Sequence, residues 1–276
     1  MGLKNFGFID DKFVVSARNK FLQQYTKEIE NIYSEDIEKV LNDDWFLKRY
    51  LILAYKDEEK AVNYLITCLK WRKEMSLRTK PDNYFPEDFY KLAGLFLYEK
   101  DKQGMPTLYI RVQLLKKIPE VMPALKRYFL HYIYKLDEEA NGNGYTMIAD
   151  FTNCGYSAYE HLDLLRFTIN SLHHYFPAGI DYVIVYNFPW VLKAFWNVVK
   201  YWIPPKRREI IKYTDEKTIT DYISKENLPD FLGGTCKRPY KAVPEGCPTS
   251  REFGIKELGL SEESVVKIID LYKPYL

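Results

Sequence analysis

The chain has 276 residues, of which 47% are hydrophobic, 28% are charged and 16% are aromatic, and its 40 basic and 38 acidic side chains leave a net charge of +2. This composition is typical of a globular protein with a sizeable core, and the near-neutral charge argues against a general nucleic-acid-binding protein. Four cysteines without a CxxC pair argue against a disulfide scaffold and a structural zinc site. The many aromatic residues fit either a large core with a Tyr-rich surface or a cavity lined by rings.

The N-terminal part of the chain is predicted to be helical. Apolar residues recur at spacings of three and four between Asp10 and Met75, and Pro81 and Pro86 end this region. We therefore expect a helical module over residues 10–80. The first residues include acids and no apolar stretch of secretory length, so we expect a cytoplasmic protein.

The middle of the chain alternates between strand and helix patterns. Strands joined by intervening helices form right-handed βαβ units, so a mainly parallel sheet is predicted. The expected strands are Thr107–Gln113, Tyr145–Phe151, Tyr182–Phe188 and Ile210–Tyr213, and the expected helices are Ala124–Ala140, Leu162–Phe176 and Trp190–Ile203. The Asn-Gly repeat at 141–144 ends the first of these helices. The fold class is thus α/β, with a sheet domain over residues 86–235 and, over residues 236–276, a loop and one short helix, Glu262–Tyr272.

Motifs for cofactor binding and catalysis are missing. The sequence has no GxGxxG or GxxxxGK[ST] phosphate loop, no GxSxG nucleophile elbow and no HExxH. The pair His173–His174 suits the end of a helix better than a metal site. Asp150 ends a central strand, where α/β proteins place ligands, but a lone aspartate fits a turn cap. We therefore expect no cofactor, no metal and no enzymatic activity.

The helix expected over Trp190–Ile203 is apolar around most of its surface. Its polar residues Lys193, Asn197 and Lys200 lie at i, i+4 and i+7, so they form one narrow stripe. Its tryptophans suit an apolar–water interface, because indole joins an apolar ring to an N–H donor. The helix is either buried between the sheet and the helical layer, or it covers a lipid-sized cavity and meets the bilayer when it opens.

Basic residues follow this helix directly. Five cations against one acid give a charge of +4 over thirteen residues: Lys200, Lys206, Arg207, Arg208 and Lys212 against Glu209. A base near an anionic leaflet is worth about 1 kcal/mol. The cluster is either a solvated helix end or a membrane-facing patch. In the second case, a peripherally membrane-associated protein is expected, with these residues at the membrane: Trp202, Lys200, Lys206, Arg207 and Arg208.

A set of spaced residues also carries a resemblance to a known family. Its parts are Tyr175-Phe176-Pro177, Ile184 to Asn187, Pro189-Trp190, Phe195, Val199-Lys200, Ile203, Leu228-Pro229 and Gly233-Gly234. In order and spacing they resemble the CRAL-TRIO lipid-binding domain, and Asp44 to Ala54 with Ala61 to Glu74 look like the helical module that accompanies it. Residues 165–235 most resemble the CRAL-TRIO domain of motile sperm domain-containing protein 2.

The resemblance implies one hydrophobic ligand held between the sheet and a mobile gate helix, here Trp190–Ile203. Ligands of related proteins are phosphatidylinositol, phosphatidylcholine, tocopherol or retinoids. In yeast-type phosphatidylinositol transfer proteins, an acidic–basic pair follows the Tyr-Pro, where this chain has Ala178 and Gly179. Their threonine and lysine after the gate helix correspond here to Arg207 and Ile210. These departures argue against an inositol-phosphate site of that type.

We predict the ligand-lining residues from the expected strands and the gate helix. They are Ile110, Ile148, Ile184 and Tyr186 in the floor, and Phe188, Trp190, Phe195, Trp196 and Val199 in the lid. The expected partners are a hydrophobic small molecule or phospholipid and a membrane surface, anionic or phosphoinositide-containing, because Lys206, Arg207 and Arg208 resemble the basic patch of tocopherol transfer protein relatives. Two alternatives stay open: a docking adaptor of the same fold that carries nothing, and an enzyme using Asp150 with a nearby His or Cys.

Overall fold

The N-terminal helices form a layer of their own in the computed structural model, which describes residues 9–24 and 29–276. Within these residues the layer contains α1 (Asp11–Gln24), α2 (Ser34–Asn42), α3 (Asp44–Leu53) and α4 (Glu58–Glu74). Side-chain oxygens of Asp43 and Asp57 accept backbone N–H groups at the starts of α3 and α4, so both aspartates are N-caps. The predicted helical character is confirmed over the described residues. Residues 1–8 and 25–28 lie outside them, so part of the N-terminal stretch on which the prediction of no signal peptide rests is not described.

A mainly parallel sheet follows in the chain. Its strands, in spatial order, are β1 (Leu95–Tyr98), β2 (Thr107–Arg111), β3 (Tyr145–Asp150), β4 (Ile180–Tyr186) and β5 (Ile211–Thr214). Within the described chain, β1 is antiparallel to β2, and the other neighbouring strands of this sheet are parallel to each other. The predicted α/β fold is therefore confirmed. The sequence prediction missed β1, because a run of four residues at a sheet edge has too little pattern to identify it.

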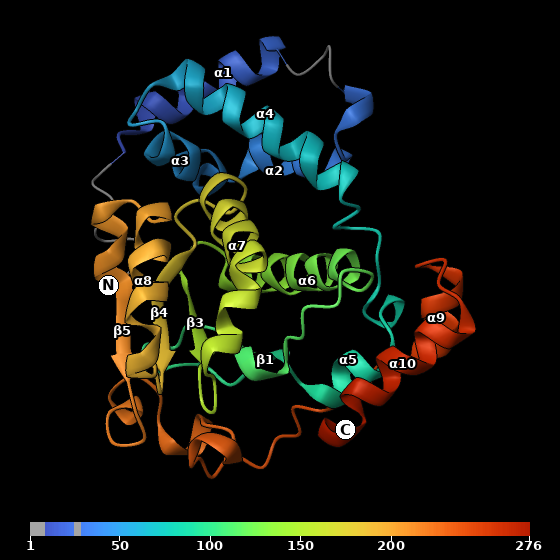
Figure 1. Ribbon diagram of the computed structural model, residues 1–276. Coiled ribbons are helices and arrows are strands. Elements are labelled where there is room, and N and C mark those ends of the chain that lie inside the picture. The colour runs from blue at the N-terminus through green and yellow to red at the C-terminus, as the bar shows by residue number, and fades with distance from the viewer. Residues whose placement is uncertain (1–8, 25–28) are drawn as a thin grey trace.

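Two helices cover one face of the sheet. They are α6 (Met122–Ala140) and α7 (Leu162–His174), and Figure 1 shows them between the N-terminal helices and the strands. As predicted, α6 ends at an Asn-Gly sequence, where Asn141 has φ of 41° and Gly142 has φ of 82°. The opposite face is covered by irregular chain, in which Ile219, Ile223 and other apolar side chains pack against the strands.

The segment expected to form one helix over Trp190–Ile203 is helical but not of one type. It begins with a 3-10 turn (Trp190–Leu192), continues as α8 (Lys193–Val199) and ends with a second 3-10 turn (Lys200–Trp202). Aromatic and β-branched residues have modest helix propensity, and the residue before Pro204 is pushed out of the helical region. The expected helix is therefore present over residues 190–202, but only Lys193–Val199 has α-helical geometry.

Within its described residues, the C-terminal tail contains two α-helices, whereas the sequence predicted one. The predicted α10 (Glu262–Tyr272) is confirmed, and α9 (Ser250–Lys256) precedes it. Thr249 and Glu252 form a capping box at the start of α9, so this start signal was present in the sequence and was overlooked. Both helices lie beside α5 (Glu87–Leu92), away from the sheet face that α7 and α8 cover (Figure 1).

Candidate functional site

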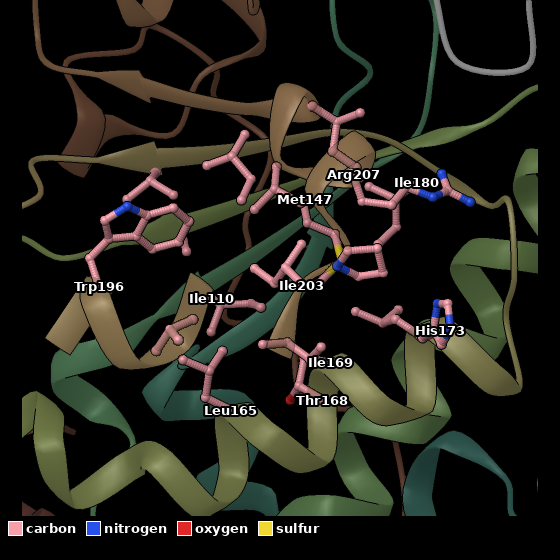
Figure 2. A pocket seen from close by; sticks show the side chains of 18 of the residues that line it. Ile110, Met147, Leu165, Thr168, Ile169, His173, Ile180, Trp196, Ile203 and Arg207 are labelled. Carbon is pink, nitrogen blue, oxygen red and sulfur yellow. The ribbon is translucent and has the colours of Figure 1, made fainter. Parts of the chain in front are cut away.

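An apolar cavity of about 210 Å³ lies between the sheet, α7 and the chain around α8. The strands contribute alternate residues of one face, including Met147 and Ala149 from β3 and Val183 and Val185 from β4. Side chains on a strand point alternately to the two faces, so this choice of residues places the cavity on the face that α7 covers. Figure 2 shows the labelled side chains around this space.

The predicted floor was partly wrong. Ile110 lines the cavity, but Ile148, Ile184 and Tyr186 lie on the opposite face of the sheet, where they are buried in a separate apolar core. The parallel register pairs Ile148 with Ile184, so the two share a face, whereas Ala149 and Val185 form the pair that faces the cavity. A shift of one residue moves a whole strand pattern to the other face, and the assignment failed by that one residue.

The predicted lid residues largely reach the cavity. Phe188, Phe195, Trp196 and Val199 line it, whereas Trp190 points elsewhere and is 79% exposed. We call residues 190–202 the lid segment. Its outward side also exposes Val198 and Tyr201, the latter by 77%, so the lid segment is apolar on both sides. The sequence-based prediction of an apolar surface nearly all round agrees with this arrangement.

Helix α7 forms a wall that the site prediction missed. Three apolar side chains of α7 line the cavity at spacings of four and three, and Phe176, two residues beyond the end of the helix, continues the spacing: Leu165, Ile169, Leu172 and Phe176. This period is that of an amphipathic helix, so the pattern could have identified the wall. The same helix contributes His173, whose pKa is lowered by burial and then by the neighbouring charges of His174 and Arg207.

The basic residues after the lid segment do not share one environment. Lys206 is exposed, but Arg207 lies in the cavity wall and is half-buried, and burial lowers the pKa of its guanidinium. Arg208 donates from Nε to the carbonyl oxygen of Ile203 at 3.0 Å. Trp202 is half-buried, and the guanidinium carbon of Arg166 lies 5.9 Å from the centroid of the Trp202 ring. The cluster thus divides into an exposed part and an arginine that reaches the cavity.

A buried ion pair connects the N-terminal helices to the cavity wall. Arg49 of α3 donates to both carboxylate oxygens of Asp137 at 2.7 and 2.8 Å, and its Nε donates to the carbonyl oxygen of Pro177 at 2.8 Å. Burial alone would raise the pKa of Asp137, but Arg49 lowers it below its usual value. Pro177 and Ala178 both line the cavity, and Ala178 has φ of 58°. Arg49 therefore holds a strained turn of the wall in place.

The other candidate features have structural roles or no assigned role. Asp150 accepts the backbone N–H of Thr152 at 2.8 Å, as expected of a turn cap. Among the described residues, no group of three or more His, Cys, Asp or Glu side chains is placed to hold a metal ion. No helix within residues 9–24 or 29–276 has both the length and the apolar character needed to cross a membrane.

Comparison with known proteins gives a consistent result. Residues 91–234 match the model of the CRAL/TRIO domain. A CRAL-TRIO domain-containing protein of Schizosaccharomyces pombe is 21% identical over 268 residues, which cover 86% of this chain and 60% of that protein. The phosphatidylinositol/phosphatidylcholine transfer protein SFH9 of Arabidopsis thaliana is 22% identical over 249 residues, with coverage of 76% and 43%. The chain thus spans 60% of the length of the first of these relatives and 43% of the second.

A solved structure shares the fold. The crystal structure of Sfh5 superposes with a TM-score of 0.63 at 16% identity and covers 95% of this chain and 100% of its own. The helical N-terminal layer and the sheet therefore belong to one known arrangement. The expected likeness of residues 165–235 to motile sperm domain-containing protein 2 is not tested by these relatives and stays a prediction.

Proposed function

The chain belongs to the CRAL/TRIO domain family, and we propose that it binds one hydrophobic ligand, a lipid or a lipid-like small molecule, in the cavity between the sheet, α7 and α8. The observation that carries this proposal is the cavity lining, in which apolar side chains of four strands and two helices face a common space of about 210 Å³. Concave, mostly apolar sites with a few polar groups are typical of small-molecule binding.

The energetics favour an apolar cavity for this task. Each methylene that leaves an apolar environment for water costs about 0.8 kcal/mol, so a bare 14-carbon tail would cost roughly 11 kcal/mol. Single hydrogen bonds contribute about 1 kcal/mol net and do not replace that amount. A carrier must therefore enclose the tail, which is the role we assign to Ile110, Phe188, Phe195, Trp196 and Val199 together with the strand and α7 residues around them.

We further propose that the ligand is exchanged with membranes through the lid segment. Trp190 and Tyr201 are 79% and 77% exposed on its outer side, and Lys206 follows them as an exposed cation. Aromatic rings beside a cation suit the interface of an anionic membrane, where each base contributes about 1 kcal/mol. The name of the Arabidopsis relative, a phosphatidylinositol/phosphatidylcholine transfer protein, supports an exchange of this kind.

Native mass spectrometry tests the bound ligand directly. The freshly purified protein is measured before and after incubation with mixed lipid vesicles, and bound lipids are extracted and identified. Ala149→Phe places a ring in the cavity, whereas Ala242→Phe adds the same ring at an exposed site. We expect a lipid-mass adduct on the wild type and on Ala242→Phe, and a strongly reduced adduct on Ala149→Phe.

The same measurement separates the carrier from the adaptor. A wild-type protein that stays at 32.9 kDa after incubation with lipids would contradict the proposal. If that protein still sedimented with vesicles, it would be a docking adaptor of this fold. An adduct equally abundant on Ala149→Phe would place the lipid outside the cavity.

A further inference from the structure

One titratable side chain of α7 lines the cavity. His173 lies in the last turn of this helix, and Figure 2 shows it with Arg207 at the end of the cavity away from Trp196. Its neighbour His174 is exposed, and the two imidazole rings meet edge to face with their centroids 4.7 Å apart. One ring of this pair therefore belongs to the cavity wall, whereas the other belongs to the surface.

The surroundings of His173 oppose a positive charge on its ring. Burial lowers the pKa of the imidazole most, followed by the charges of His174 and of Arg207, which belongs to the 3-10 segment Pro205–Ile210. Burial also lowers the pKa of Arg207, and the hydroxyls of Tyr145 and Tyr55 act on it in the opposite direction. At neutral pH, His173 is therefore an uncharged part of the wall.

The rest of the lining adds no group that titrates near neutral pH. At the His173 end, Pro177 and Ala178 of the turn and Ile180 of β4 are apolar. Tyr213 also lines the cavity, but burial raises the pKa of its hydroxyl, so it stays neutral. Among the described residues that line the cavity, His173 is thus the one whose charge changes between about pH 5 and 8.

An apolar ligand and a proton on His173 oppose each other. The ring is half-buried, so solvent reaches it in the ligand-free protein, and a ligand that fills the cavity removes that water. Loss of water costs the charged imidazolium more than the neutral imidazole, so the pKa of His173 is lower in the bound protein than in the free protein. As the pH falls, the free protein takes up the proton first, and acid therefore weakens binding.

We propose that protonation of His173 releases the ligand, so that the cavity binds its ligand at neutral pH and gives it up in mildly acidic surroundings. This inference rests on the proposed function and specifies how the same site is regulated. An anionic leaflet attracts protons as it attracts basic side chains, so its surface is more acidic than the bulk solution. Docking of the lid segment therefore brings the cavity to a place where protonation is favoured.

A binding titration over a series of pH values tests the inference. The probe is N-phenyl-1-naphthylamine, a fluorescent apolar amine that stays neutral between pH 5 and 8, and circular dichroism at each pH verifies that the protein is folded. We expect the Kd to rise severalfold between about pH 7.5 and 5.5. The rise should not exceed about tenfold, because a single group whose pKa in the free protein is no higher than about 6.5 changes affinity by at most that factor over this range.

Non-titrating variants identify the responsible group. His173→Gln keeps a polar side chain and His173→Leu matches the apolar wall, and both should bind the probe with the same affinity at the two pH values. His174→Gln is the matched control, because His174 is the exposed neighbour on the same helix. His161→Gln is a second control, because burial lowers the pKa of His161 outside the cavity lining. Both controls should keep the pH dependence.

Nuclear magnetic resonance of the histidine side chains measures the linked proton directly. Saturation with the probe should lower the pKa of His173 and change that of His174 much less, because ligand and proton affect each other reciprocally. A His173 pKa that is the same with and without the probe would contradict the linkage.

The outcomes separate this inference from the proposed function. A wild-type Kd that is constant between about pH 7.5 and 5.5, or a pH dependence that persists in both His173→Gln and His173→Leu, would overturn the inference and leave the ligand site intact. If the probe does not bind but a lipid adduct forms, the adduct is compared after incubation at both pH values, and equal abundance would overturn the inference. Absence of both probe binding and lipid adduct at every pH would refute the proposed function itself.

Discussion

Replacing Arg49 with methionine should destabilise the protein by about 3 kcal/mol. The Arg49 and Asp137 side chains are only 2% and 7% exposed, and the pair is bidentate with distances of 2.7 and 2.8 Å. Removing one partner of a buried pair costs about 3–5 kcal/mol, because the other charge stays buried without compensation. Arg72 lies 3.9 Å from Asp137 and compensates part of that charge, so we expect the lower end of the range.

Urea unfolding followed by tryptophan fluorescence measures this loss. The double variant Arg49→Met with Asp137→Leu removes both charges and should recover most of the stability, because apolar replacement of a buried pair is often close to neutral. The control is Lys267→Met, whose exposed pair with Glu263 should change the free energy of unfolding by less than about 0.5 kcal/mol. A loss below about 1 kcal/mol for Arg49→Met, or a double variant as unstable as the sum of the single variants, would refute the reasoning.

Three further predictions concern the membrane, pH and a turn. Trp190→Asp and Tyr201→Asp should each reduce co-sedimentation with anionic vesicles severalfold, whereas Tyr64→Asp on α4 should not; equal binding by all three would contradict the docking role of the lid segment. Burial lowers the pKa of three histidines, so as the pH falls the unfolded chain binds protons at these residues before the folded chain does. The urea midpoint should therefore fall as the pH drops below about 6.5. A midpoint that stays constant between about pH 7.5 and 5.5 would contradict this prediction. These histidines are His131, His161 and His173. Gly234→Ala would bring a Cβ to 1.9 Å from a backbone carbonyl oxygen and should cost about 3 kcal/mol in unfolding experiments, whereas Gly155→Ala meets no atom within 4 Å and should cost far less.

The local sequence pattern located most of the secondary structure. Strands β2 to β5 and helices α6, α7 and α10 lie within a few residues of their predicted positions, because each depends on periodicity and stop signals inside one short segment. The edge strand β1 was not found, since four residues acquire their strand identity mainly from pairing with β2. The helix expected over Trp190–Ile203 is present, but the sequence did not show that its first and last turns are 3-10 rather than α-helical, because composition identifies an apolar segment and not its turn geometry.

The site itself was decided by packing between distant segments. Alternation along β3 and β4 shows that each strand has two faces, but both faces are apolar here, so the sequence alone did not determine that Ala149 rather than Ile148 faces the cavity. That choice follows from α7 and the lid segment covering one face while residues around Ile219 cover the other. Burial of a charge is equally non-local: Arg207 was expected at a membrane surface, but the packing of distant segments places it in the cavity wall.

The sequence by itself determined the fold class, the family resemblance and the apolar character of the lid segment, because these depend on patterns within neighbouring residues. The tertiary structure decided which residues surround a common space and which charges leave water. Arg49 and Asp137 are 88 positions apart, and their pairing braces a turn that neither segment reveals alone. Contacts of this kind arise only when the helical layer packs against the sheet domain, because side-chain contacts across such distances in the chain exist only in the folded state.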